Sequence, residues 1–307
     1  MELDPAIAQL LEMGRGQPPL ESMSVADARA SMHQRLELLR PLAPADIETQ
    51  NLLIPSPAGS LPIRLYRPPD VEGLLPVVVW FHGGGWVLGS IETHDNVCRF
   101  LAQEGPLLVV NVAYRLAPEH KSPAQQTDTM AALDWVAADI VAHGGDPARI
   151  IVGGDSAGGN LAALGAIEAR TKGPALAGQL LVYPVTDYPA DTMASYAENA
   201  EFGLTRSAME WFWAHWLDEN AGPDAQTAPL RAADLSGLPP AYVITASHDI
   251  LRDEGVAYAG RLEAAGVLAA HDAVEGVIHG FFSMPGLAPI STAAVQRAAR
   301  WAASIGA

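Results

Sequence analysis

The chain has 307 residues, 49% hydrophobic and 17% charged, a composition that excludes a disordered protein and fits one large α/β domain. Its 18 basic and 35 acidic residues give a formal net charge of −17, which argues against nucleic acid and anionic membranes because both need a basic surface. The single cysteine, Cys98, excludes an intrachain disulfide. The N-terminus is acidic where a signal peptide is basic, and no apolar run approaches the ~20 residues that span a bilayer. We therefore expect a soluble, cytoplasmic protein.

Helical spacing of apolar residues opens the chain, and strands follow. Residues up to about 45 predict two amphipathic helices, interrupted by Gly and Pro at 16–19. The predicted strands are residues 51–54, 61–66, 76–81, 107–112, 150–153, 180–183, 241–246 and 267–274, and the predicted helices are 127–143, 157–171, 252–265 and 291–303. This alternation is typical of a mostly parallel sheet with helices on both faces. An aromatic-rich stretch at about 187–220 interrupts it and predicts inserted helices.

A nucleophile motif follows the strand predicted at 150–153. Residues 153–160 read Gly-Gly-Asp-Ser-Ala-Gly-Gly-Asn, which places Gly-x-Ser-x-Gly between a strand and a helix. A sharp turn there lifts the serine hydroxyl out of the sheet, and side chains two residues to either side would collide with the turn. A phosphate loop is excluded because Lys-Ser/Thr does not follow Gly158. We predict that Ser156 is a nucleophile, against the alternative of a glycine-rich turn that only packs.

Three glycines follow the strand predicted at 76–81, in the sequence His-Gly-Gly-Gly-Trp at 82–86. Such a backbone can approach a ligand closely and direct two N–H groups toward one point, as the oxyanion of acyl transfer requires. The N–H of Ala157, the residue after the nucleophile, would be a third donor. Taken alone, the glycines would fit a flexible loop equally well.

A serine nucleophile needs a base and an acid, which follow it in the order acid, then histidine, in folds of this kind. Four histidines follow Ser156: His215, His248, His271 and His279. We favour His279, because Gly280 follows it and it comes after the last predicted strand, and we keep His248 as the main competitor. Asp249 follows a predicted strand at the same sheet edge as Ser156 and is the favoured candidate for the acid that orients the base. Asp253 and Glu254, one turn later, suit a helix N-terminus, and we take Asp155 as a structural or surface acid.

Together these segments resemble the bacterial branch of the hormone-sensitive-lipase-like esterases, a family of α/β-hydrolases. The resemblance runs through almost the whole chain. It rests on His-Gly-Gly-Gly-Trp at 82–86, Tyr-Arg-Leu-Ala-Pro-Glu at 114–119, Gly-Asp-Ser-Ala-Gly-Gly-Asn at 154–160, Leu-Pro-Pro-Ala at 238–241, Asp-Ile-Leu-Arg-Asp-Glu at 249–254 and His-Gly-Phe at 279–281. The Gly-Asp-Ser-Ala-Gly sequence corresponds to one subgroup of the family.

The resemblance implies a single α/β-hydrolase domain over residues 1–307, with an eight-stranded, mostly parallel sheet and a helical cap formed by about 1–45 and about 187–220. By position it implies the triad Ser156, Asp249 and His279. It also implies Gly83, Gly84 and Ala157 as the oxyanion donors, and a supporting structural role for residues 114–119. One departure is Ile250, since the family usually has Pro after the catalytic Asp.

The implied reaction is acyl transfer from a short- to medium-chain ester to Ser156, then hydrolysis, with no metal or organic cofactor. Amides, carbamates or lactones are alternative substrates for the same triad, and a small-molecule receptor or an interfacial lipase is less favoured. The expected partner is a small-molecule ester, and a homodimer is left open. Six aromatic residues near the motifs or in the insertion are candidates for substrate contact: Trp86, Phe202, Trp211, Phe212, Phe281 and Phe282.

Overall fold

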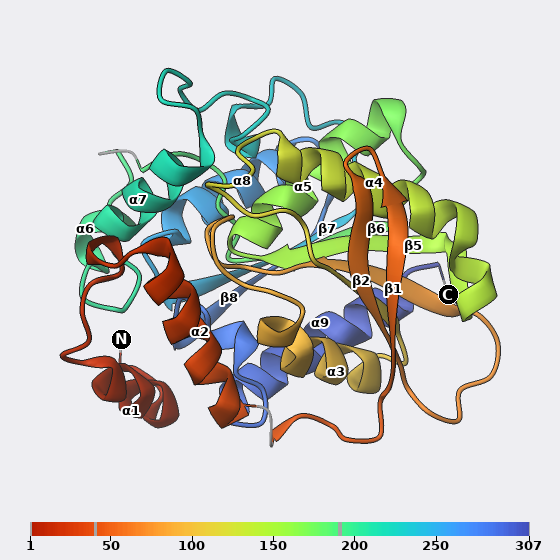
Figure 1. Ribbon diagram of the computed structural model, residues 1–307, viewed down its shortest axis with the longest axis horizontal. Helices are drawn as coiled ribbons and strands as arrows, with labels where there is room; N and C mark the ends of the chain where they lie inside the picture. The colour runs from red at the N-terminus through yellow and green to blue at the C-terminus, as the bar shows by residue number, and fades with distance from the viewer. Residues whose placement is uncertain (1, 40–41, 190–191, 307) are drawn as a thin grey trace.

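The computed structural model describes residues 2–39, 42–189 and 192–306 and contains an eight-stranded sheet (Figure 1). The strands are β1 (Glu48–Ser56), β2 (Gly59–Arg67), β3 (Leu75–Phe81), β4 (Leu108–Val112), β5 (Gly145–Asp155), β6 (Gly178–Val182), β7 (Ala241–His248) and β8 (Leu268–Ile278). Their spatial order is β1-β2-β4-β3-β5-β6-β7-β8. The pairs β1–β2 and β2–β4 are antiparallel and the others are parallel. The predicted fold class is confirmed.

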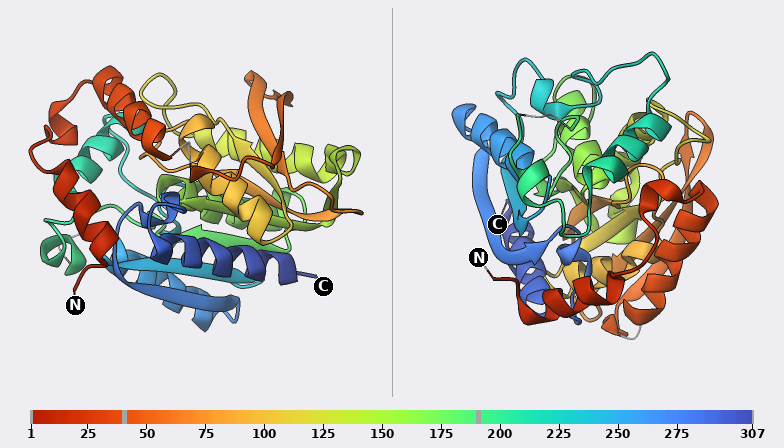
Figure 2. Two further views of the ribbon diagram at one scale, coloured as in Figure 1. Left: turned by 90° about the horizontal axis from the view of Figure 1, so that it is seen from below. Right: turned by 90° about the vertical axis from the view of Figure 1, so that its left-hand side faces the viewer.

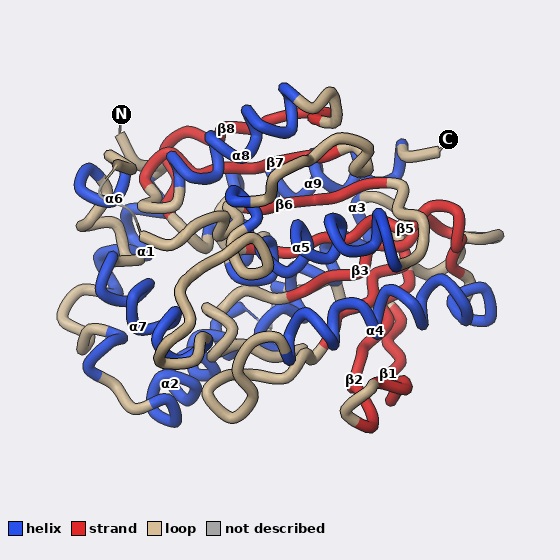
Figure 3. Tube along the Cα trace, turned by 90° about the horizontal axis from the view of Figure 1, so that it is seen from above, coloured by secondary structure: helices blue, strands red, loops and turns tan. Residues whose placement is uncertain are grey.

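Helices cover both faces of this sheet, as the alternation of strands and helices predicted. They are α3 (Asp95–Glu104), α4 (Ala124–Asp139), α5 (Ala157–Lys172), α8 (Arg252–Ala264) and α9 (Pro289–Ser304). Figure 3 shows α4, α5 and α8 over one face, while α3 and α9 lie side by side on the other in Figures 1 and 2. The sequence predicted four of these helices but not α3.

The two faces of the sheet bury two separate hydrophobic cores, which explains why the central strands are apolar throughout. In β3, Val77, Val79 and Phe81 pack on the face covered by α4 and α5, whereas Val78 and Trp80 pack against α3 and α9. All seven residues of β3 are buried. Because successive side chains of a strand point to opposite faces, a strand covered on both sides needs an uninterrupted apolar run.

Four further helices lie together at one end of the molecule: α1 (Pro5–Gly14), α2 (Val25–Leu39), α6 (Ser195–Glu198) and α7 (Arg206–Trp216). The right-hand view of Figure 2 shows them in front of the sheet, although they come from distant parts of the sequence. Helix α2 is bound to the loop after β3, since its Arg29 donates from Nε to the carbonyl of Val87 at 2.9 Å. Within the described ranges, no helix combines the length and the apolar character needed to cross a bilayer.

Candidate active site

The turn between β5 and α5 has the strained geometry that the Gly-x-Ser-x-Gly sequence predicted. Ser156 has φ 56° and ψ −119°, a conformation rarely adopted by a residue with a side chain. A Cβ on Gly158 would collide with the carbonyl oxygen of Phe81, and one on Gly154 would collide with the backbone of Gly158. Glycine is therefore required on both sides of the serine, and the predicted steric reason is confirmed. Ser156 is largely buried, with 7% of the residue exposed.

The structure brings Ser156, His279 and Asp249 into one chain of hydrogen bonds. Asp249 follows β7 and His279 follows β8, so both loops emerge at the carboxyl end of the sheet. His279 Nε2 lies 2.9 Å from Ser156 Oγ, and His279 Nδ1 lies 2.7 Å from Asp249 Oδ2. The Asp249 side chain is fully buried, whereas 14% of the His279 side chain is exposed. A buried carboxylate can therefore orient a ring that is still accessible to a substrate.

The other three histidines after Ser156 have different partners. Nδ1 of His248 lies 2.9 Å from Ser247 Oγ, and its ring contacts Phe202. His215 bonds to the carbonyl of Trp211, one turn earlier in α7. His271 lies on β8 and bonds to Thr245 Oγ1. His279 is the histidine whose ring joins Ser156 to Asp249.

The inserted segment between β6 and β7 holds the loop that carries Asp249. Asn199 donates from Nδ2 to the carbonyl of Asp249 at 3.0 Å, and the Ser195 hydroxyl donates to the carbonyl of Ile250 at 2.6 Å. Asp253 accepts from the backbone N–H of Ser195 at 2.8 Å. Ile250, which departs from the proline usual in the family, is completely buried. These contacts hold the acid loop without that proline.

Glu254 is a buried carboxyl group that the sequence placed only at a helix N-terminus. It is fully buried and accepts from the backbone N–H of Thr186 at 2.8 Å and from the Tyr196 hydroxyl at 2.9 Å. Burial raises the pKa of Glu254 to about 8, because these hydrogen bonds do not offset the lost hydration of the charged form. The folded protein therefore favours the protonated acid at neutral pH.

Glu254 is therefore expected to destabilise the fold progressively as pH rises. The unfolded chain releases this proton near the ordinary pKa of ~4.3, so the penalty is absent below that pH and grows until pH passes about 8. Glu254→Gln keeps an acceptor and removes the charge. The free energy of unfolding of this variant, minus that of the wild type, should increase from pH 5 to pH 9. Urea titration measures both. Glu263→Gln, an exposed change on the same helix, is the control. A gain that does not vary with pH would contradict the expectation.

The glycine loop at 82–86 corrects one predicted donor. The backbone N–H of Gly83 is directed at the carboxylate of Asp155, with nitrogen and Oδ1 3.1 Å apart, and at His94 Nε2, 3.2 Å away. Gly83 is buried, so this N–H is already satisfied within the protein and cannot also serve an oxyanion. Glycine is required at 83 for close approach, since a Cβ there would strike the Asp155 side chain.

The next two glycines, Gly84 and Gly85, are better placed to donate to an oxyanion. Among the described residues, neither Gly84 nor Gly85 has a hydrogen-bond partner for its N–H, and Gly84 is partly exposed. Both have positive φ, 116° and 59°. Ala157 is the first residue of α5, where a helix leaves its N–H groups free. Gly84, Gly85 and Ala157 are therefore the residues of these two segments whose N–H groups remain available among the described residues.

The aromatic candidates divide into three groups. Trp86, Phe281 and Phe282 have no exposed surface and belong to the hydrophobic cores, so the prediction that they contact substrate is wrong for this conformation. Trp86 instead stacks on Trp216 of α7, with ring centroids 3.8 Å apart. These residues were singled out for their position in sequence, which does not reveal which way a side chain points.

Phe202 packs edge-on against His248, with ring centroids 4.7 Å apart. It lines a cleft of about 480 Å³ together with His248 and Arg252. In contrast, the ring of Phe212 lies directly against Gly85, and Trp211 packs edge-on to Phe212 with centroids 5.3 Å apart. Phe212 is thus a residue of the insertion that reaches the glycine loop.

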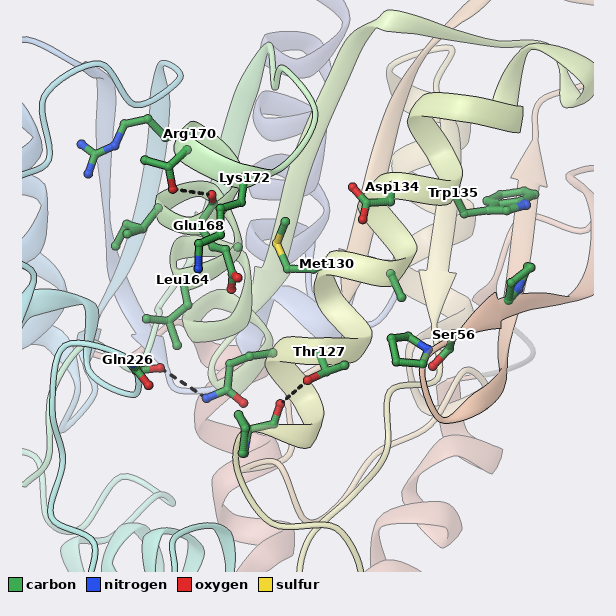
Figure 4. Close-up of a pocket in the computed structure, with 18 of the residues that line it drawn as sticks. Ser56, Thr127, Met130, Asp134, Trp135, Leu164, Glu168, Arg170, Lys172 and Gln226 are labelled. Atoms are coloured by element: carbon green, nitrogen blue, oxygen red, sulfur yellow. Dashed lines mark hydrogen bonds between the residues drawn. The ribbon is translucent and has the colours of Figure 1, made fainter.

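A larger cleft of about 1020 Å³ is separate from the triad. Figure 4 shows that Thr127 and Met130 of α4 and Leu164 of α5 line it, on the outer side of the sheet. Ser156, Asp249 and His279 are not among its lining residues. The size of a cleft therefore does not locate the reactive centre here.

Asp155 and His94 were not predicted as parts of the site. The position of Asp155 next to the nucleophile was a signal, but its side chain could equally have pointed outward. His94 lies shortly after the glycine loop and just before α3, but it precedes Ser156, whereas the chain order of this fold places the catalytic histidine after the serine. Nothing in the sequence indicates that its ring meets Asp155, with Nε2 and Oδ1 3.1 Å apart.

Comparison with known proteins identifies the family to which this chain belongs. Residues 78–283 match the family model described as the alpha/beta hydrolase fold. Carboxylesterase NlhH of Mycobacterium tuberculosis is 45% identical over 77% of this chain and 76% of its own length. The ethyl acetate hydrolase of Pseudomonas putida is 34% identical over 92% and 93%. A solved esterase from Pyrobaculum calidifontis, 40% identical, covers 99% of both chains with a TM-score of 0.92. The chain therefore belongs to the hormone-sensitive-lipase-like esterases of the α/β-hydrolase superfamily, and it is a carboxylic ester hydrolase.

Proposed function

We propose that Ser156, His279 and Asp249 are the catalytic triad of this serine carboxylesterase. The observation that carries the proposal is the unbroken chain from Asp249 Oδ2 through the His279 ring to Ser156 Oγ, with links of 2.7 and 2.9 Å. These distances allow a proton to pass from the serine hydroxyl to the imidazole as the oxygen attacks a carbonyl. The test is loss of ester hydrolysis on replacing each member, with the fold retained.

In the proposed reaction Ser156 Oγ attacks the ester carbonyl while His279 Nε2 takes its proton. Asp249 stabilises the imidazolium that forms, and the N–H groups of Gly84, Gly85 and Ala157 bind the oxyanion. His279 then gives its proton to the leaving alcohol, which leaves the acyl group on Ser156. Water attacks this acyl-enzyme by the same route, the carboxylic acid is released and the serine is restored.

We also propose that α1, α2, α6 and α7 form a cap over the acyl site, within a single domain. Two contacts support this proposal: the Phe212 ring against Gly85, and the Arg29 bond to Val87, just beyond the glycine loop. Arg29 also forms a two-pronged ion pair with Glu119, with both N–O distances at 2.8 Å. A cap of helices over the acyl site limits the size of the pocket and so favours small esters over long triglycerides.

The substrate should therefore be an ester of a short or medium acyl chain. Each methylene that fits gains about 0.8 kcal/mol of burial, roughly a fourfold increase, so kcat/KM should rise with chain length and then fall when the chain meets the cap. By resemblance to the family we expect the maximum near C4–C8, and the name of the ethyl acetate hydrolase supports short acyl groups. Measuring kcat/KM on p-nitrophenyl esters from acetate to palmitate decides this. A maximum at palmitate, or a jump at the solubility limit, would indicate an interfacial lipase.

Phe212 should help to set that limit, because its ring lies over Gly85 at the oxyanion loop. Phe212→Leu is expected to move the maximum of kcat/KM toward longer acyl chains, since it opens space beside the site. The matched control is Phe202→Leu, which changes an aromatic residue of the insertion that lines the separate cleft at His248. If both variants shift the maximum equally, Phe212 has no special role.

We further propose a small-molecule ester as the natural partner and the cytoplasm as the place of action. The net charge of −17 supports a partner other than nucleic acid or an anionic membrane. The one cysteine, Cys98, is a buried free thiol, which suits a reducing compartment. Homodimer formation stays a prediction that light scattering can test.

A further inference from the structure

The residue before the nucleophile carries a buried carboxylate that takes no part in the proposed proton transfers. Asp155 is 4% exposed, and Gly154, just before it, pairs with Phe81 at the end of β3. The glycine loop and the serine turn therefore leave the sheet side by side. Beyond that pair, the contact from Gly83 nitrogen to Asp155 Oδ1, at 3.1 Å, joins the two segments again.

The pattern of contacts determines where the protons lie around Asp155. His94 Nε2 lies 3.1 Å from Asp155 Oδ1 and 3.3 Å from Oδ2. A bare ring nitrogen would repel both carboxylate oxygens, so Nε2 must carry a proton and donate it. The N–H of Gly83 then cannot donate to His94 Nε2, and its acceptor is Asp155. Burial alone would raise the pKa of Asp155, but His94, together with His82 and the Gly83 N–H, outweighs it and the pKa is lowered, which agrees with a charged carboxylate.

Two further bonds hold the same stretch of backbone. Nδ1 of His82 lies 2.8 Å from the carbonyl oxygen of Gly83, and the Tyr114 hydroxyl donates to the carbonyl of His82 at 2.7 Å. Burial lowers the pKa of His82 to about 3, so its ring is neutral and Nδ1–H is free to donate to Gly83. With the Asp155 contact, both backbone groups of Gly83 are held. The backbone of Gly84 is therefore fixed at its junction with Gly83, and the Gly84 N–H is the first of the proposed oxyanion donors.

We infer that Asp155 and His94 are positioning residues that set the distance between the oxyanion donors of the glycine loop and Ser156. The inference rests on the proposed roles of Ser156, Gly84 and Gly85. Asp155 precedes Ser156 in the chain, so tying Gly83 to its side chain ties the donors to the attacking oxygen. Donors act on a transition state only when they are already in place, and errors of about 1 Å are costly.

His94 has an electrostatic part in this arrangement as well. An unpaired carboxylate beside Ser156 would oppose the negative charge that develops on the oxyanion, in a place where little water can screen it. The proton on His94 Nε2 is donated to both carboxylate oxygens of Asp155 and partly compensates their negative charge near the oxyanion. The same pair thus holds the loop and limits repulsion of the oxyanion.

A pair of β-branched variants of equal size tests the inference. Asp155→Thr keeps a side-chain oxygen that can accept the Gly83 N–H, whereas Asp155→Val has none. Each is also made with His94→Gln, so that no buried imidazole is left without its carboxylate partner if a single variant fails to fold. The control is Asp128→Asn, since Asp128 is an equally buried carboxylate that pairs with Arg115. For each variant kcat, KM and affinity for an alkyl boronic acid are measured, with thermal unfolding alongside.

We expect Asp155→Val to lower kcat about 10- to 100-fold with KM changed less than threefold, because a single donor lost outright costs ~10²–10³. Boronic acid affinity should fall with kcat, and Asp155→Thr should recover most of both. Asp128→Asn should lower thermal stability only. The inference is overturned if the Thr and Val variants lose kcat equally, or if Val lowers stability but leaves kcat and boronic acid affinity intact.

A separate measurement distinguishes failure of this inference from failure of the proposed triad. Diethyl p-nitrophenyl phosphate should label one serine per chain, with peptide mapping to Ser156, and the number of labelled sites corrects kcat for inactive protein. Wild-type protein that is not labelled at Ser156 would refute the triad itself. Full labelling combined with unchanged kcat in Asp155→Val would leave the triad in place and refute only the positioning role.

Discussion

Replacing Ser156 by Ala is expected to reduce kcat for p-nitrophenyl butyrate by about 10⁶-fold, the scale of loss seen when a serine hydrolase loses its nucleophile. The physical reason is that no other hydroxyl occupies the strained turn between β5 and α5, 2.9 Å from His279 Nε2. Rates with substrate in excess, on protein purified away from host esterases, measure the loss.

The variant should keep its fold, because among the described residues the Ser156 hydroxyl bonds to His279 and to no core group, and its removal leaves α5 intact. Far-UV circular dichroism and thermal unfolding check this. A matched control is Ser247→Ala, which removes a hydroxyl bonded to His248 rather than to His279. Residual kcat above about one-thousandth of wild type would refute Ser156 as the nucleophile.

His279→Ala is expected to lower kcat by several orders of magnitude, whereas His248→Ala should lower it far less. The ring of His279 lies within hydrogen-bond reach of both Ser156 and Asp249. Wild-type activity should also fall toward acid pH, since a protonated imidazole cannot accept the serine proton. Rates of the two variants across pH, beside the wild type, measure both effects.

The reverse result, with His248→Ala inactive and His279→Ala active, would require a different base and a different acid. His248 remains a fair control because it adjoins Asp249 in sequence and contacts Phe202, so its loss tests the effect of disturbing the acid loop. Loss of activity in both variants with intact folds would mean that the two histidines act together.

The sheet could be predicted from the sequence because its central strands are buried on both faces. Each strand is a nearly continuous apolar run, and glycine or proline marks many of its ends. The predicted bounds were too short where a strand begins with polar residues, as in β5, whose first residues Asp146 and Arg149 form a local ion pair. Helix α3 was not predicted, although Val97 and Leu101 have helical spacing, because its buried face is only about two turns long.

The triad could be predicted because chain order and sheet topology bring the ends of three strands together. The oxyanion donors could not be assigned within a run of glycines, because consecutive N–H groups point in different directions. At Gly83 this direction depends on Asp155, a contact between residues 72 positions apart. The prediction that Phe281 and Phe282 contact substrate was wrong for the same reason. The sequence does not reveal whether a phenylalanine side chain points into the core or into the pocket.

The insertion between β6 and β7 is joined to the acid loop by groups that belong to both. Asn199, Ser195 and Tyr196 bond to Asp249, Ile250 and Glu254 in turn. An enzyme engineer who grafted this insertion from a relative to change selectivity would also change what supports the catalytic acid. Chimeras should therefore exchange residues 186–199 and 249–254 as one unit. Grafts that take the insertion alone should lose turnover before they gain new substrates.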